Sequence, residues 1–213
     1  MTGPVASEAR SAARRPAVAE RRMLALDAFL DLLLEGHLPP TPEQVARRVG
    51  ISMATFFRYF DSLDELRREA SARILQRFSH LYRLPDIGAG PRDERIDRFV
   101  AIRVDLWETI HPLAKLTRSN ALRDPGAAET VEFGRVAMAD QIRRHFGVEL
   151  RALTSSQREN AVATIASLTS VESWEQFRNT HGRSAAQTRR AWSQAIDRTL
   201  EARGSQRVQG RVE

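Results

Sequence analysis

Residues 41–60, TPEQVARRVGISMATFFRYF, decide the fold of the N-terminal part of this chain. Thr41 and Gln44 have the spacing of a Thr-x-x-Gln capping box, which places the start of a helix directly after Thr41. Pro42 is suited to the first turn, where its missing N–H is not needed. The sequence therefore predicts a short helix over residues 42–49, with Thr41 as its N-cap.

A second short helix follows after only a few residues. Gly50 allows the chain to reverse where a Cβ would clash, and Ile51 is an apolar plug between the two helices. Ser52 is a favourable N-cap for a helix over 53–60. Two short helices joined by a tight turn that contains glycine are typical of a helix-turn-helix, whose second helix lies in the major groove of DNA.

The segment VARRVGISMATFFRYF at 45–60, followed by DSLDEL at 61–66, resembles the TetR-type transcriptional regulators. This resemblance covers about residues 17–80. It implies an N-terminal three-helix DNA-binding domain, a long linking helix and a C-terminal helical domain that binds an effector and dimerises. It also implies double-stranded operator DNA as partner, with Thr55 and Tyr59 at positions that commonly contact phosphate and residues 52–54 at positions that contact bases.

The predicted DNA-binding residues are the cap of the first helix, its two arginines and the outward positions of the second helix. They are Thr41, Arg47, Arg48, Ser52, Met53, Ala54, Thr55, Phe57, Arg58 and Tyr59. Five further arginines of the N-terminal region are expected to reach an adjacent minor groove: Arg10, Arg14, Arg15, Arg21 and Arg22.

Three departures from the family pattern leave an alternative open. Phe57 stands where a tyrosine is usual, Leu63 where a lysine is usual, and Met53 with Ala54 where lysine and glycine are often found. The first two remove groups that would anchor phosphates. The alternative is therefore a ligand-binding or interaction module of the same fold with weak or lost operator binding.

The rest of the chain reads as helical, so the predicted fold class is all-α. Apolar residues repeat at helical spacing, a linker occupies 84–92, and His111-Pro112 predicts a kink or break. Two final helices are expected at roughly 156–178 and 184–203, with Ser156 and Ser184 as caps. The predicted organisation is a disordered basic arm at 1–16, a DNA-binding domain at 17–62, a ligand-binding and dimerisation domain at 63–203 and a flexible tail at 204–213.

Composition excludes several classes of protein. The chain has 213 residues, 42% of them hydrophobic, with a net charge of +6 and no cysteine, so disulfides and thiolate chemistry are excluded. No apolar run approaches the roughly 18 residues of a membrane span, and we expect a cytoplasmic protein without a membrane partner. No phosphate-binding glycine loop or nucleophile elbow occurs, and the five histidines are scattered, so no enzyme activity, cofactor or metal site is predicted.

The C-terminal domain is expected to bind a small-molecule effector. Arg103 lies on the apolar face of its helix, so its side chain must extend to solvent, pair with a carboxylate or face a polar cavity where it grips an anionic effector. The predicted pocket residues are Arg103, Trp107, His111, Phe133, Met138, Trp174 and Phe177. For the five apolar residues among them, a place in the plain core is the favoured interpretation.

The last two helices carry a stripe of small and large apolar residues that suits a twofold helical interface. The predicted dimer residues are Val162, Ile165, Ala166, Thr169, Trp192, Ala195 and Ile196. The sequence thus predicts a homodimeric regulator, a ligand-responsive repressor released from a pseudo-palindromic operator by its effector. Activator action stays open, because the position of the operator decides it.

Overall fold

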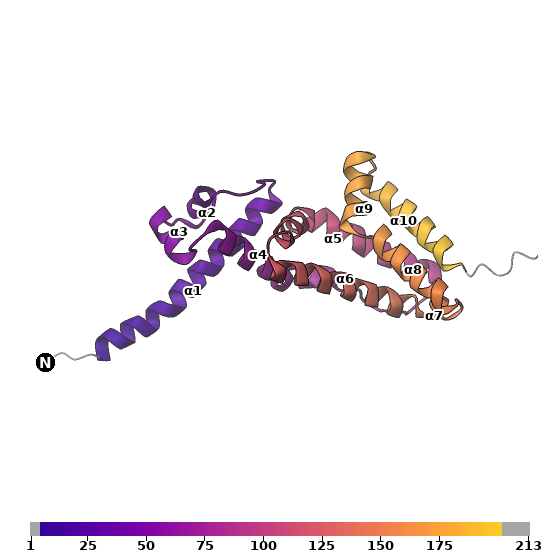
Figure 1. Ribbon diagram of the computed structural model, residues 1–213, viewed down its shortest axis with the longest axis horizontal. Helices are drawn as coiled ribbons and strands as arrows, with labels where there is room; N and C mark the ends of the chain where they lie inside the picture. Colours follow the sequence, from indigo (N-terminus) through magenta and orange to yellow (C-terminus); the bar gives the residue numbers. More distant parts are fainter. Residues whose placement is uncertain (1–4, 202–213) are drawn as a thin grey trace, which may run out of the picture. The chain divides into compact units, whose positions relative to one another are not determined.

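The computed structural model describes residues 5–201, and these residues form helices and connecting turns with no strand, which confirms the all-α class (Figure 1). The elements are α1 (Val5–Leu34), α2 (Pro42–Val49), α3 (Met53–Tyr59), α4 (Leu63–Phe78), η1 (Ser79–Tyr82), α5 (Arg92–Ala121), α6 (Pro125–His145), α7 (Gly147–Arg151), α8 (Ser155–Leu168), α9 (Val171–Glu175), η2 (Gln176–Thr180) and α10 (Ala185–Leu200). In the described part of the chain, no helix has the length and apolar character needed to cross a bilayer.

The chain divides into two compact units. Unit 1 contains the described residues up to His80 together with Pro112–Thr130, and unit 2 contains Leu81–His111 together with the described residues from Val131 onward. Helices α5 and α6 therefore each contribute residues to both units.

In unit 1, α1 contacts α2 and α4, and α2 contacts α3. Figure 1 shows α2 and α3 beside the C-terminal half of α1. The side chains that meet between these helices are apolar and almost completely buried: Phe29, Leu30, Leu33, Val45, Phe56, Phe60 and Leu66. Burial of these side chains provides the main stabilisation of the unit, at roughly 1.5–3 kcal/mol for each large apolar group.

Helix α4 is part of unit 1 because arginines join it to α1. The guanidinium of Arg73 donates two hydrogen bonds of 3.0 Å to the Asp27 carboxylate, and Arg77 donates one of 2.6 Å to Asp31. The DNA-binding domain predicted from the sequence ends at residue 62, before this helix. Side-chain pairing over such a sequence distance gives no periodic signal in the sequence.

Helix α1 begins much earlier than the sequence predicted. It starts at Val5, so residues 5–16 of the predicted disordered arm are helical in the structure. Their sequence, VASEARSAARRP, is rich in Ala and Arg, which are among the strongest helix formers, and this outweighs the single Pro16. Residues 1–4 of the arm and the predicted tail at 204–213 lie outside the described residues.

In unit 2, helix α8 is the centre of the packing. It contacts α7, α9 and α10, and η2 also contacts α10. Figure 1 shows α8 and α10 side by side. The core between the helices of this unit is apolar and almost completely buried: Phe99, Val104, Ile142, Phe146, Ile165, Trp192 and Ile196.

Two predicted helix boundaries are corrected. Helix α5 runs unbroken through Pro112, because buried packing of Pro112 and Leu113 compensates for the lost backbone hydrogen bond. The predicted helix at 156–178 is divided into α8, α9 and η2, and its capping box is formed by Thr154 with Gln157 rather than by Ser156. The predicted cap at Ser184 is present.

Candidate functional site

The helix-turn-helix of unit 1 has the caps that its sequence predicts. The Thr41 and Gln44 capping box is complete, with the Thr41 N–H donating to Gln44 Oε1 at 2.8 Å. Gly50 takes the left-handed conformation at φ 71°, which favours glycine over any residue with a Cβ. The hydroxyl of Ser52 accepts the N–H of Thr55 at 3.1 Å and caps α3. These local bonds fix the angle at which α3 leaves the turn.

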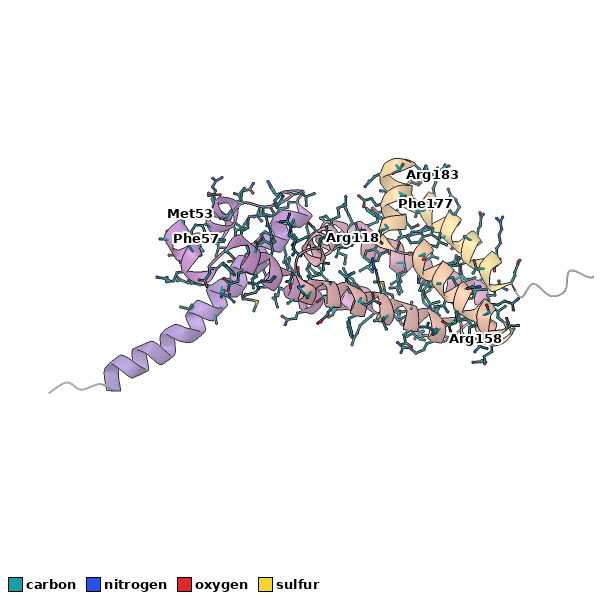
Figure 2. All side chains as sticks on the ribbon, in the orientation of Figure 1. Met53, Phe57, Arg118, Arg158, Phe177 and Arg183 are labelled. Carbon is teal, nitrogen blue, oxygen red and sulfur yellow. The ribbon has the colours of Figure 1, made fainter. Side chains whose placement is uncertain are left out.

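Helix α3 has one buried and one exposed side. Phe56 and Phe60 are fully buried, whereas the Phe57 side chain is 51% exposed and Ala54 and Arg58 are also exposed. Figure 2 shows Met53 and Phe57 on the outer side of this short helix. The Phe57 ring makes an edge contact with Phe56 at 5.4 Å between centroids, and about half of its side chain remains exposed beside Ala54 and Arg58.

Tyr59 corrects the predicted list of DNA contacts. It is only 6% exposed and lies on the buried side of α3 with Phe56 and Phe60. Helical spacing explains the position, because Tyr59 follows Phe56 by three residues and so shares its face. Tyr59 is therefore a packing residue of unit 1.

The predicted arginines differ in how their charge is balanced. Arg47 is exposed near the end of α2, and Arg58 lies with its guanidinium 5.8 Å from the Tyr59 ring centroid. Arg48 instead donates two hydrogen bonds, of 2.9 and 2.6 Å, to the Glu35 carboxylate. Hydrogen bonding from Arg48 also holds the pKa of Glu35 below its usual value. Arg48 is thus partly neutralised, whereas no carboxylate pairs with Arg47 or Arg58 among the described side chains.

Arg22 is also placed differently from the prediction that it reaches a minor groove. Its guanidinium donates to the Tyr59 carbonyl at 2.9 Å and to Glu65 at 2.9 Å, and it also bonds Glu69. It lies 4.9 Å from the centroid of the Phe60 ring. Arg22 therefore joins α1 to the end of α3 and the start of α4, while Arg21 is exposed. Nothing in the sequence pattern distinguishes the roles of these neighbouring arginines.

The seven residues predicted for an effector pocket all belong to unit 2, but the structure gives them different surroundings. Trp107 is buried and donates its Nε1–H to the Thr169 carbonyl at 2.9 Å. Trp174 is buried, donates to Glu108 at 3.0 Å and stacks against His111 at 4.5 Å between ring centroids. Both tryptophans are thus held by the chain itself.

The remaining pocket residues are less enclosed. Phe133 is 68% exposed, so its prediction as a pocket residue is corrected: it lies on the outer face of α6. Met138 and Phe177 are half-buried, and Phe177 makes an edge contact with Trp192 at 6.2 Å. Helical spacing shows that residues share a face, but it does not show whether that face meets solvent.

Arg103 is the most unusual residue of unit 2. Its side chain is buried at 1% exposure, and Nη2 donates to Gln141 Oε1 at 2.7 Å while Nη1 has no hydrogen-bond partner. Burial lowers the pKa of Arg103 to about 10 and raises the pKa of the nearby Tyr82 to about 12. Arg103 therefore stays protonated, and Tyr82 stays neutral, at physiological pH. Gln141 and Tyr82 were not predicted as neighbours of Arg103, because a polar residue on a helix carries no sequence signal of what it contacts.

A cavity of about 830 Å³ is present in unit 1, away from every residue predicted for an effector pocket. Its lining includes Leu33, Arg67, Lys115 and Leu116 from α1, α4 and α5. At its edge the Asn120 amide donates to the Ser71 hydroxyl at 3.1 Å. Among the described residues, no group of three or more His, Asp or Glu side chains could hold a metal ion.

Most of the residues predicted for the dimer interface point into their own unit. Val162, Ile165, Thr169, Trp192 and Ile196 are each at most 3% exposed. The prediction is corrected for these five residues. Their side chains are already buried where the helices pack on each other and on the rest of unit 2. Only Ala166 and Ala195 of the predicted set are partly exposed.

Comparison with known proteins identifies the fold. No family model and no curated protein sequence matches the chain. Among solved structures, it is similar to SCO7518 of Streptomyces coelicolor A3(2), a provisionally assigned transcriptional regulator, with 20% identity, a TM-score of 0.50 and coverage of 86% of this chain and 99% of that one. It is also similar to the multidrug binding protein EbrR in complex with imidazole, with 14% identity, a TM-score of 0.53 and coverage of 88% and 98%. The resemblance of residues 45–66 to the TetR-type regulators is thus confirmed at the level of the fold.

Proposed function

We propose that this chain is a DNA-binding transcriptional regulator that places α3 in the major groove of an operator. The observation that carries this proposal is the division of α3 into a buried side, with Phe56, Tyr59 and Phe60, and an exposed side, with Ala54 and Phe57. An isolated helix of seven residues would not hold its conformation, so the buried side and the Ser52 cap preorganise the exposed one.

The exposed side of α3 indicates how bases and phosphates would be contacted. Met53, Ala54 and Phe57 are apolar, which suits contacts with thymine methyl groups better than hydrogen bonds to guanine. Arg47 and Arg58 have guanidinium groups that are exposed and suited to phosphate oxygens. We therefore expect affinity to depend on salt, and selectivity to depend on apolar contacts.

Operator binding by this class of fold uses two copies related by a twofold axis, each with α3 in one half-site. We propose that α8 and α10 form the dimer interface through the helix faces that point away from the core of unit 2. The exposed face of α8 carries the small residues Ala163, Thr164 and Ser167, which allow a partner helix to approach closely.

We further propose that unit 2 binds a small-molecule effector and that this binding changes the affinity for DNA. The unsatisfied Arg103 and the similarity to EbrR, a multidrug binding protein, support this part of the proposal. The effector must bind more tightly to the form of the dimer that has low DNA affinity, because equal affinity for both forms shifts nothing. Whether the protein represses or activates depends on where its operator lies.

A second candidate function is an interaction or ligand-binding module with weak DNA binding. The exposed Phe57 favours it, because this position lacks the phenolic hydroxyl that the family pattern provides for a phosphate. The two candidates differ in sequence selectivity: a module of this kind would bind all duplexes alike and weakly.

The deciding experiment is fluorescence anisotropy on labelled duplexes from the region next to the gene, titrated at several salt concentrations. Arg47→Ala and Arg58→Ala should each reduce the slope of log affinity against log salt by about 1, and Phe57→Ala should reduce selectivity among sequences. Arg135→Ala in unit 2, where the side chain is 63% exposed, is the matched control and should bind like the wild type. If the wild type forms no salt-sensitive and sequence-selective complex, the main proposal is wrong.

The dimer is tested separately by sedimentation equilibrium. Ala163→Arg should dissociate it, because a long charged side chain replaces a methyl group at a close helix contact. Arg190→Ala, an exposed change on α10, is a milder comparison variant. A wild type that stays monomeric at concentrations where it binds operator would contradict the dimer.

A further inference from the structure

Arg103 is a buried cation whose charge the chain does not neutralise. Its guanidinium lies 5.0 Å from the centroid of the Phe99 ring, and its only hydrogen bond among the described residues is the one to Gln141. Gln141 is itself held in place, since its Nε2 donates to the Tyr82 carbonyl at 2.8 Å. The amide of Gln141 therefore fixes one side of the guanidinium and leaves Nη1 without a partner.

No carboxylate compensates for this charge. Within the described part of the chain, no Asp or Glu forms an ion pair with Arg103. Arg103 interacts electrostatically with the phenol of Tyr82, but burial raises the pKa of that phenol to about 12, so it carries no negative charge at neutral pH. An arginine in this state lacks both a counter-charge and one hydrogen-bond acceptor, and a single anionic oxygen would supply both.

Helix α5 also contains Arg95, a buried arginine whose role is structural only. Arg95 lies eight residues earlier on the buried face of α5 and is 3% exposed. Its guanidinium forms an ion pair with Glu149 and donates to the carbonyls of His145 at 2.7 Å and Gly90 at 3.1 Å. Burial alone therefore does not explain why Arg103 lacks a counter-charge, because Arg95 is buried on the same helix and has a carboxylate partner.

We propose that Arg103 binds the anionic group of the effector, and that the effector is an organic anion with an apolar body. This inference rests on the proposed function of unit 2 and adds the chemical class of its ligand. The planar guanidinium presents Nη1 to a carboxylate or phosphate oxygen. The side chains around Arg103 include Phe99, which suits the apolar part of such a molecule. A neutral ligand would leave the charge of Arg103 uncompensated.

Tryptophan fluorescence is the direct readout, because all three tryptophans, Trp107, Trp174 and Trp192, lie in unit 2. The probes are straight-chain alkanoates from hexanoate to decanoate, each compared with the amide of the same length. We expect saturable binding of at least one alkanoate, about tenfold or more tighter than binding of its amide, with a parallel rise in Tm. This comparison uses the wild type and needs no substitution.

Two variants assign the effect to the residue. Arg103→Met keeps the length and apolar contacts of the side chain and should reduce the preference for alkanoate over amide to nearly one, whereas Arg103→Lys should retain part of it. Arg143→Met, which removes an exposed arginine of α6 in the same unit, is the matched control and should bind like the wild type. Circular dichroism of each variant confirms that it is folded.

Three results would overturn the inference: equal binding of alkanoates and amides, an unchanged preference in Arg103→Met, or no saturable binding of any alkanoate in the series. Operator binding without any probe is measured in parallel. Its absence contradicts the proposed function and leaves the anion site standing, whereas normal operator binding without an alkanoate preference contradicts only the anion site.

Discussion

Two buried arginines of α5 have opposite surroundings: Arg95, near the N-terminal end of the helix, and Arg103, well inside it. At the Arg95 end, each nitrogen of the Arg95 guanidinium has a partner: Glu149 supplies the charge, and the carbonyls of His145 and Gly90 supply acceptors. Around Arg103, Nη1 has no acceptor and no carboxylate is paired with the charge within the residues that the structure describes. The difference is that the charge of Arg95 is compensated by a carboxylate within the described residues, whereas the charge of Arg103 is not.

The aromatic residues of α3 show a similar division in unit 1. Tyr59 and Phe57 are two residues apart, yet the first is 6% exposed and the second is 51% exposed. Tyr59 is therefore a core residue, whereas the exposed half of the Phe57 side chain can be contacted by another molecule. Position on the helix separates the two roles, although both side chains are large and aromatic.

The largest effect is expected for Arg95→Met. Removing this side chain leaves the buried Glu149 carboxylate and the His145 carbonyl without their donor, and breaking such a buried pair costs about 3–5 kcal/mol of unfolding free energy. Urea denaturation followed by circular dichroism measures it. Arg92→Met removes an arginine of the same helix whose partner Asp197 is half exposed, and it should cost much less. Equal losses of unfolding free energy in the two variants would show that the Arg95–Glu149 pair stabilises the fold no more than an ordinary surface pair does.

The next effect is expected for Tyr59→Ala, which leaves a cavity beside Phe56 and Phe60 and should cost about 3 kcal/mol. Phe57→Ala removes a side chain that is half exposed, so its cost should stay below about 1 kcal/mol, and its main effect should fall on DNA binding. Thermal unfolding of both variants gives the comparison. A Tyr59→Ala variant with the Tm of the wild type would show that Tyr59 does not pack as the structure indicates.

Arg103→Met is expected to change stability in the opposite direction from Arg95→Met. Without ligand, it removes a buried charge that has no counter-ion and replaces it with an apolar side chain of similar length, so the unfolding free energy should rise by about 1 kcal/mol. The same urea titration detects this. A loss as large as that of Arg95→Met would mean that the chain pairs Arg103 after all.

The smallest effect is a pH dependence at the Arg95 end. His145 accepts the Gly88 N–H at Nδ1 and lies 3.0 Å from the Arg95 carbonyl through Nε2, which fixes the neutral ring with its proton on Nε2. Burial lowers the pKa of His145 below its ordinary 6.5, although the bond to the Arg95 carbonyl opposes this shift.

The unfolded chain therefore takes up a proton on His145 before the folded chain does, as the pH falls below 6.5. The contribution of the neutral His145 to the unfolding free energy should be fully present above pH 6.5. It should decrease as the pH falls toward the pKa of His145 in the folded chain. Burial raises the pKa of Glu149, but hydrogen bonds from Arg95 and from its own backbone N–H lower it below 4.5, so its contribution is lost only at more acid pH. Urea titrations between pH 7 and 5 measure the first decrease, and His145→Gln should flatten it. An equally steep decrease in His145→Gln would assign the effect to another group.

The sequence predicted those features that depend on neighbours a few residues away. The capping box at Thr41, the turn at Gly50 and the cap at Ser52 were all predicted, because each is a bond or conformation within three or four residues. The all-α class followed from apolar residues repeated at helical spacing. The resemblance to a known family then indicated the fold of the whole chain.

The tertiary structure alone decided what each helix face meets. The sequence placed Tyr59, through the family resemblance, on a DNA-contacting surface and Phe133 in an effector pocket, but the first side chain is buried and the second faces solvent. It also could not show that Val162 and Ile196 pack within their own unit, or that Arg95 has a carboxylate while Arg103 has none. Periodicity defines a face by the angle between residues on one helix, whereas burial and charge pairing depend on which other helix lies opposite. The partners of Arg95 and Arg103 on those helices are 54 and 38 residues away in the sequence.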